Sequence, residues 1–146
     1  MTSKARAIPI IRLRSLLIVS IQTELSDELV MALKEDLAWE LSRGSAVGVV
    51  IELSGVDIFD SFIASSIRDI SQVARLMGAE TVVAGLDPAM AITLVEMGMG
   101  MGGVRTALNL DAAFTSLEQM ARERQREDDL LVGRLLEAVL REGAPR

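Results

Sequence analysis

Residues 47–85, VGVVIELSGVDIFDSFIASSIRDISQVARLMGAETVVAG, decide the fold of this chain. The run over 47–53 is almost entirely apolar, which is typical of a strand buried on both faces of a sheet. A turn over 54–60 leads into a predicted helix of about residues 61–77, and 81–85 form a second buried strand. Strand, helix and strand in this order predict two parallel strands joined by a right-handed crossover. The apolar stripe expected on the helix consists of Phe62, Ile63, Ile67, Ile70 and Val73 or Ala74.

The segment before this unit predicts a hairpin and a helix. Residues 8–22 hold two short runs of β-branched residues separated by Arg14-Ser15, which favours two strands with a tight turn. Ser26 or Asp27 can cap the helix that follows, and Gly44 is a typical stop. The stripe expected to be buried on this helix consists of Leu29, Leu33, Leu37 and Leu41, widened by Val30 and Trp39.

The segment after the unit continues the alternation. Asp87-Pro88 predicts the start of a third helix that ends at Gly98. The four glycines of 98–103 resemble a phosphate-binding loop only weakly, because a helix precedes them and no GK[ST] follows. A strand over 104–108 and a helix capped by Asp111 complete the pattern. We therefore expect an α/β fold: a single domain with a mixed, mostly parallel sheet that helices cover.

The last residues differ in composition from the rest. Arg122 to Asp129, RERQREDD, are almost all charged, and leucines and valine at helical spacing follow. We therefore divide the chain into a domain at 1–121 and a charged, helical extension at 122–146. This extension either packs back on its own domain or contacts another copy or a partner.

Composition restricts the function. The chain has 146 residues, a formal net charge of −6, no cysteine and no histidine. An acidic balance argues against nucleic-acid binding, which depends on Lys and Arg at phosphates. Without His or Cys, the usual general base and the commonest zinc ligands are absent. We expect no catalytic residue, no metal site and no cofactor. We also expect a cytoplasmic protein, since no secretory signal or membrane-length apolar run is found.

The stretch from Asp57 to Ile63 joins a buried strand to a helix and carries the functional hypothesis. Ser61 there is a candidate N-cap, which alone would explain a serine. Alternatively Ser61 is phosphorylated, which would add negative charge beside Asp57 and Asp60 without unfolding the domain. Such a change suits a binding switch, with Phe62 completing the expected partner-binding residues.

At this point a family resemblance becomes visible. The run DIFDSFIASSIRDI at 57–70 resembles the D-x-x-D-S-F-I-A signature around the phosphorylation site of stressosome scaffold proteins of the RsbS kind, which are STAS-domain anti-sigma factor antagonists. The resemblance covers about residues 7–120 and extends to IPIIRLRSLLIVSIQTELSD, LMGAETVVAGLDPAMAITLVEMG and TALNLDAAFTSL. It implies a STAS fold and a non-enzymatic scaffold in which Ser61 is the phosphorylated serine.

The resemblance also implies partners. These are sensory co-scaffold STAS proteins like RsbR, a serine/threonine kinase like RsbT that binds the scaffold and phosphorylates it, and a phosphatase like RsbX. Homo- and hetero-oligomers are typical of the family. Thr93 falls near a second phosphorylated position of co-scaffold paralogues. The chain departs from the family pattern in its charged tail and in its glycine-rich 98–103 loop.

Three alternatives remain open from the sequence. An enzyme would need Asp57 and Asp60 to converge on a pocket as acid and base. A ligand-sensing STAS domain would bind a nucleotide or lipid without covalent change. A scaffold independent of phosphorylation would use Ser61 only as a helix cap.

Overall fold

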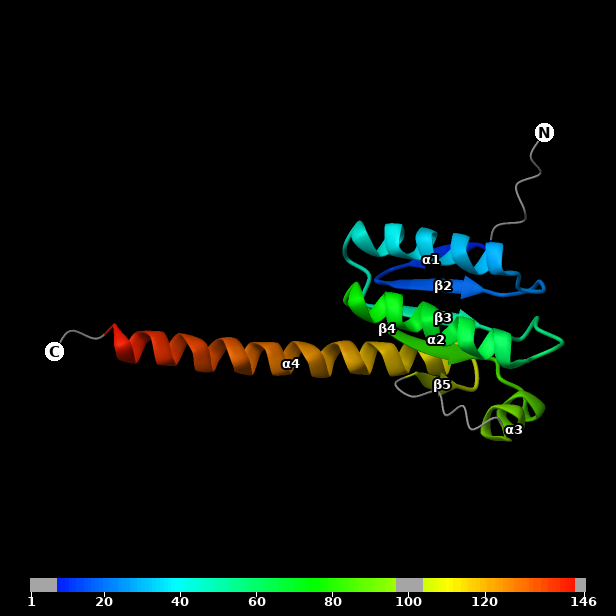
Figure 1. Cartoon of the computed structure of the whole chain (residues 1–146). Helices are drawn as coiled ribbons and strands as arrows, with labels where there is room; N and C mark the ends of the chain where they lie inside the picture. The colour runs from blue at the N-terminus through cyan, green and yellow to red at the C-terminus, as the bar shows by residue number, and fades with distance from the viewer. Residues whose placement is uncertain (1–7, 97–103, 144–146) are drawn as a thin grey trace.

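The computed structural model describes residues 8–96 and 104–143. It holds one sheet of five strands that lie side by side in chain order. β1 pairs with β2 antiparallel, and every later pair is parallel, which confirms the predicted α/β class (Figure 1). The strands are β1 (Ile10–Leu13), β2 (Leu16–Ser20), β3 (Gly48–Glu52), β4 (Glu80–Ala84) and β5 (Arg105–Ala107).

The predicted hairpin between the first two strands is confirmed. Leu13 pairs with Leu16, so only Arg14 and Ser15 form the turn. Arg14 has φ 55°, in the left-handed region that tight hairpin turns use at their first central position.

Helices cover both faces of the sheet. α1 (Asp27–Ser42) and α2 (Ser61–Leu76) contact each other and lie over one face, because successive right-handed crossovers between strands in chain order place their helices on the same side. α3 (Pro88–Glu96) connects β4 to β5. α4 (Leu110–Glu142) contacts β3, β4 and β5 from the other face with its first turns.

Burial along β3 explains its continuous apolar run. Val49 and Ile51 belong to the core beneath α1 and α2, whereas Val50 belongs to the smaller core beneath α4. All three side chains are fully buried. Leu117 of α4 fills the second core, where a Cβ added to Gly48 would lie 2.8 Å from its Cδ2 atom. The strand therefore needs apolar residues at successive positions, and a side chain at residue 48 would require the Leu117 side chain to shift.

The predicted caps of α1 and α3 are confirmed, and the predicted cap of α4 is wrong. Ser26 accepts a hydrogen bond from Leu29 N at 3.2 Å, and Asp87 accepts one from Met90 N at 2.8 Å. The cap of α4 is Asn109, whose Oδ1 accepts from Ala112 N at 2.9 Å, and Asp111 lies in the first turn instead. A carboxylate in the first turn still interacts favourably with the helix dipole.

The stripe predicted for α1 is also corrected at one position. Trp39 is 74% exposed, because the buried stripe follows positions three or four residues apart and residue 39 points away from it. The buried side chains are Val30, Leu33, Leu37 and Leu41.

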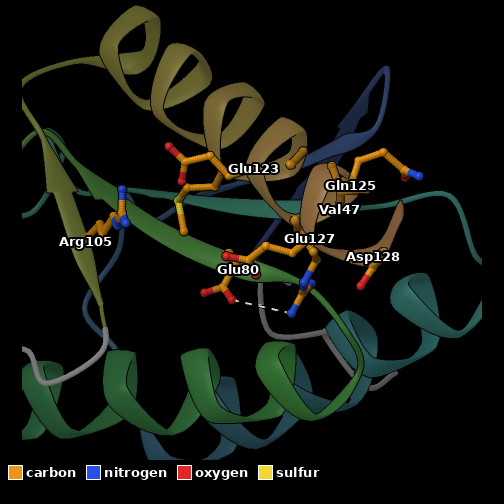
Figure 2. A pocket seen from close by; sticks show the side chains of 10 residues that line it. Val47, Glu80, Arg105, Glu123, Gln125, Glu127 and Asp128 are labelled. Carbon is orange, nitrogen blue, oxygen red and sulfur yellow. Dashed lines mark ion pairs between the residues drawn. The ribbon is translucent and has the colours of Figure 1, made fainter. Parts of the chain in front are cut away.

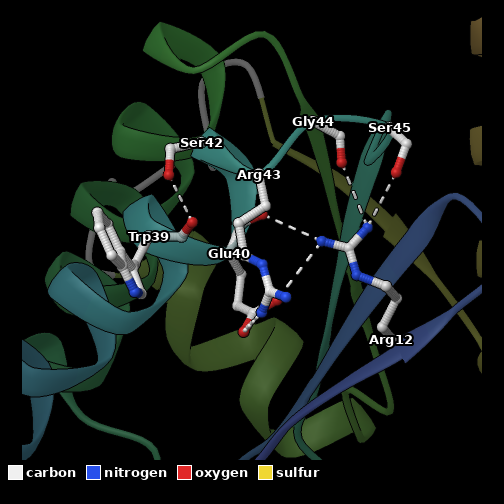
Figure 3. Close-up of polar contacts among 7 residues, drawn as sticks. All are labelled: Arg12, Trp39, Glu40, Ser42, Arg43, Gly44 and Ser45. Atoms are coloured by element: carbon white, nitrogen blue, oxygen red, sulfur yellow. Dashed lines mark hydrogen bonds and ion pairs between the residues drawn. The ribbon is translucent and has the colours of Figure 1, made fainter.

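Arg12 of the hairpin forms hydrogen bonds with the end of α1 and the residues that follow it (Figure 3). Its guanidinium donates to Glu40 O at 3.0 Å, to Gly44 O at 3.4 Å and to Ser45 Oγ at 3.2 Å, and it pairs with the Glu40 carboxylate at 3.5 Å. A cation at this place satisfies backbone carbonyls that the end of a helix leaves unpaired.

α4 is one uninterrupted helix, so the predicted boundary between 121 and 122 lies inside it. Its second half leaves the sheet and projects from the domain (Figure 1). The predicted loop over 98–103 lies outside the described residues, and the strand predicted at 104–108 is β5. In the ranges that the structure describes, no helix has the length and apolar character needed to cross a bilayer.

Candidate functional site

The candidate site lies where the carboxyl ends of β2 and β3 meet the start of α2. Parallel pairing continues past both strands, since Ile21 N donates to Glu52 O at 3.0 Å and Leu53 N donates to Ala84 O at 2.9 Å. The loops that follow β2 and β3 are therefore held side by side at one edge of the sheet. This edge is where open α/β sheets generally place their binding residues.

The loop after β3 begins in a constrained conformation. The Glu52 carboxylate accepts a hydrogen bond from Ser54 N at 2.8 Å. Gly85, at the end of the neighbouring strand, has φ 80°, and a Cβ there would lie 2.9 Å from Ser54 N. A glycine is thus required for the two chain segments to approach, and the Glu52 carboxylate fixes the start of the loop that leads to residues 57–61.

Asp60, not Ser61, caps α2. Its Oδ1 accepts from Ile63 N at 2.9 Å, and Ser61 is the first helical residue. The prediction of Ser61 as the N-cap is therefore wrong, because the chain enters the helix one residue earlier than the serine. Ser61 is exposed. The fold does not use its hydroxyl as a cap, so helix capping does not explain this serine.

A surface pocket of about 260 Å³ adjoins this turn. Asp57, Asp60 and Phe62 line it as three of the four predicted partner-binding residues, and Ser61 lies between the last two in the chain. Ile58, also in the lining, is 76% exposed. The remaining lining residues are Gln22, Thr23, Glu24, Leu25, Gly55, Val56 and Ile63.

The chemistry of this pocket is acidic and apolar. Its lining contains the carboxylates of Glu24, Asp57 and Asp60 and no basic side chain. Asp57 and Asp60 are both exposed, which favours ordinary solvated carboxylates over an acid–base pair. Among the described residues, no group of three or more acidic side chains is placed to hold a metal ion. The arrangement suits contact with a protein surface.

Thr93, the second candidate for phosphorylation, has a different environment. It lies half-buried in α3, and its Oγ1 donates to Ala89 O at 2.8 Å. None of the residues that line the pocket beside Asp60 belongs to α3.

Sequence reasoning missed a second polar site, at the opposite end of the sheet, where α4 leaves the domain (Figure 2). Arg124 donates to Gly78 O at 3.1 Å and pairs with Glu80 at 3.7 Å. A hollow of about 360 Å³ there is lined by side chains of both charges, including Glu80, Arg105, Glu123 and Asp128. These contacts attach the charged run of α4 to the domain.

Comparison with known proteins identifies the family of this chain and similar solved structures. A family model described as STAS domain matches residues 7–113. An RsbS variant from Moorella thermoacetica, carrying a serine-to-glutamate substitution, is 36% identical with a TM-score of 0.68, and the match covers 79% of this chain and 97% of that one. A chain from a structure of the stressosome, described as a signal integration and transduction hub, is 37% identical with a TM-score of 0.68, covering 78% of this chain and 99% of that one.

Curated relatives match over a shorter stretch. The RsbT co-antagonist protein RsbRA of Bacillus subtilis (strain 168) is 34% identical over 76 residues, which cover 51% of this chain and 28% of RsbRA. The RsbT co-antagonist protein RsbRD of the same organism is 32% identical over 66 residues, which cover 45% of this chain and 24% of RsbRD. The chain thus spans about a quarter of these two relatives. The family model ends at residue 113, so most of α4 lies beyond it.

Proposed function

Because this chain belongs to the STAS domain family and is similar to RsbS over most of the domain, we propose that it is a non-enzymatic scaffold of a stressosome-type signalling complex. In this proposal it sequesters a serine/threonine kinase in the cytoplasm, and phosphorylation of Ser61 ends that binding. The observation that carries the proposal is an exposed serine in the first turn of α2 whose capping role is taken by Asp60.

Exposure and position make Ser61 a suitable acceptor. A kinase needs access to the hydroxyl, and Ser61 lies on the surface beside a turn. The free N–H groups and dipole of a helix N-terminus tolerate an added anion, so the modified domain stays folded. Phosphorylation therefore changes the surface of the domain and leaves its core unaltered.

The surroundings of Ser61 explain why the modification would weaken binding. Ile58 is 76% exposed and Phe62 is 37% exposed, so apolar side chains are available for a partner next to the hydroxyl. A phosphate adds about −1.5 to −2 charges at neutral pH. Burying this charge beside the carboxylates of Asp57 and Asp60, against the apolar groups of a partner that accepts the neutral hydroxyl, would be costly.

The proposed partners follow from the family. The names of RsbRA and RsbRD describe co-antagonists of RsbT, and we propose that the present chain assembles with RsbR-like sensory proteins and binds an RsbT-like kinase. An RsbX-like phosphatase would restore the unmodified state. Thr93 stays a second candidate for phosphorylation.

Intact-mass spectrometry tests the modification directly. The full chain, incubated with the candidate kinase and ATP, should gain one phosphate, and Ser61→Ala should gain none. Tandem mass spectrometry then identifies the residue, including any second phosphate at Thr93. A wild-type chain that stays unmodified with every cognate kinase, or is modified only elsewhere, would contradict the switch.

Kinase binding tests the consequence of the charge. Ser61→Ala should bind as wild type does, whereas Ser61→Asp should bind at least about tenfold more weakly, a loss of about 1.4 kcal/mol. Gln72→Glu is a matched control because it adds one negative charge on the exposed surface of α2, about three turns away. Equal affinities of Ser61→Asp and wild type would contradict the proposal that negative charge at residue 61 weakens kinase binding.

The ligand-sensing alternative finds less support in the pocket. A nucleotide or an anionic lipid headgroup needs donors for its phosphate oxygens, and three carboxylates line this pocket without a basic side chain. Its volume of about 260 Å³ also lies below the usual range of ligand pockets, about 300–1,000 Å³.

A further inference from the structure

The second half of α4 exposes large apolar side chains along its whole length. Every described residue from 122 onward is exposed. Seven large apolar side chains there are 53–72% exposed, although the helix is regular to its end. They are Leu130, Leu131, Val132, Leu135, Leu136, Val139 and Leu140, and we call the last six of them the 130–140 surface.

The polar residues of this segment show which side faces water. Arg134, Glu137 and Arg141 follow one another at three- and four-residue steps, so they form a single polar row along the helix. Leu130, four residues before Arg134, lies in this polar row, and the other six apolar side chains occupy the opposite side of the helix, centred near Val132 and Val139. This surface is therefore continuous along the helix.

The size of the surface fits a protein partner. The six exposed side chains on this side amount to roughly 600 Å², at the upper end of the about 300–600 Å² that the largest apolar patch on a typical monomer covers. A stable protein–protein interface buries about 800 Å² on each partner. One copy of the 130–140 surface therefore supplies about three quarters of the area that each side of such an interface needs.

We propose that the 130–140 surface pairs antiparallel with the same surface of a second copy of this chain. In a two-fold symmetric pair the same surface of both copies forms the interface, so a second copy of this helix can cover the apolar side chains of the first. The pairing goes beyond the proposed switch, because it uses the helix that leaves the domain at the end opposite to Ser61 (Figure 1).

Asp128 determines the direction of the pair. It lies one turn before Val132 and therefore on the apolar side of the helix. In a parallel pair the two Asp128 carboxylates would face each other across the seam, where like charges are destabilising. In an antiparallel pair each Asp128 lies beyond the last turn of the opposite helix and stays in water. The antiparallel pair also keeps the two globular domains at opposite ends.

The oligomeric state of the full chain tests the pairing. Light scattering coupled to size exclusion should show a dimer at micromolar concentration. The double variant Leu136→Glu/Val139→Glu should raise the dissociation constant about 100-fold or more, since two carboxylates would have to be buried. Arg134→Glu is the control, because it introduces the same side chain within the polar row and should leave the dimer intact. Phosphorylation of Ser61 should be unchanged in both variants.

Three results would overturn the proposal. They are a wild-type chain that is monomeric at high micromolar concentration, a double variant that remains as associated as wild type, and an Arg134→Glu variant as dissociated as the double variant. Circular dichroism melting confirms that the variants keep a folded domain. A loss of pairing with normal kinase binding, or the reverse, separates this inference from the proposed function.

Cysteine cross-linking tests the direction, because the chain has no cysteine of its own. With the seam centred between Leu135 and Leu136, Val132 of one copy faces Val139 of the other. Equal amounts of Val132→Cys and Val139→Cys chains should therefore give mainly the mixed disulfide dimer on mild oxidation. Disulfides formed only between identical chains would contradict the antiparallel arrangement.

Discussion

The two halves of α4 contain similar apolar residues in different surroundings. In the first half, Ala113 and Leu117 are buried against the sheet. In the second half, leucines on the same unbroken helix are more than half exposed. The sheet of the same chain packs against the first half, and in the proposed pair a second copy of the chain packs against the second half. A continuous helix is thus no sign of a continuous domain.

The largest expected effect compares Leu117 with Leu135. Leu117→Ala should lower the free energy of unfolding by about 2–5 kcal/mol, because the side chain is 1% exposed and fills the core beside Val50 and Val82. Leu135→Ala should change it by less than about 0.5 kcal/mol when both are measured by urea denaturation in the monomeric Leu136→Glu/Val139→Glu background. Similar losses at the two positions would break the comparison.

A second prediction tests which residue caps the start of α2. Asp60→Ala should lower the free energy of unfolding by about 1 kcal/mol, because it removes the acceptor for Ile63 N. Ser61→Ala should cost less than about 0.5 kcal/mol, since this serine is an exposed first-turn residue. Thermal melts measure the loss of stability in both variants. A larger loss for Ser61→Ala than for Asp60→Ala would show that the serine caps the helix.

A third prediction concerns a polar atom inside the packed region. Thr81 is 4% exposed, and its Oγ1 has no hydrogen-bond partner in the part of the chain that the structure describes. Thr81→Val should therefore raise the free energy of unfolding by about 1 kcal/mol, because a buried hydroxyl without a partner is destabilising. Chemical denaturation measures the change, and a destabilised variant would show that the hydroxyl does make a bond.

The smallest effect is expected at the junction of the two halves. Arg124→Ala should change stability by less than about 1 kcal/mol, because its pair with Glu80 is partly exposed. Amide hydrogen exchange should nevertheless become faster near residues 120–126, since the bond to Gly78 O is lost. Unchanged exchange there would show that packing alone directs the second half of α4.

Periodicity predicted most of the fold because it reports which faces are buried. The apolar run of β3 and the leucine stripe of α1 each follow the period of their element, and both are buried as expected. The caps at Asp60 and Asn109 were missed because each has a second plausible capping residue close by, and local preference cannot choose between them. The path of the incoming loop makes that choice.

About half of the candidate site was visible in the sequence. Asp57, Asp60 and Phe62 come from one stretch and line the pocket as a group. The segment from Gln22 to Leu25 was missed because only the parallel pairing of β2 with β3 brings it there. The topology would predict it, because the loops that follow two neighbouring parallel strands lie at the same edge of the sheet. The bond from Arg124 to Gly78 spans 46 residues, and no local pattern encodes it.

The opposed placement of Ser61 and the free half of α4 has a geometric consequence for a paired molecule. In the proposed antiparallel pair, the two domains are separated by a helical segment of about 30 Å, and each directs its serine away from the seam. Two kinase molecules can then be held by one pair without steric conflict. Kinase binding at one Ser61 would therefore be independent of kinase binding at the other. Each pair would release its two kinase molecules one at a time as the serines are phosphorylated.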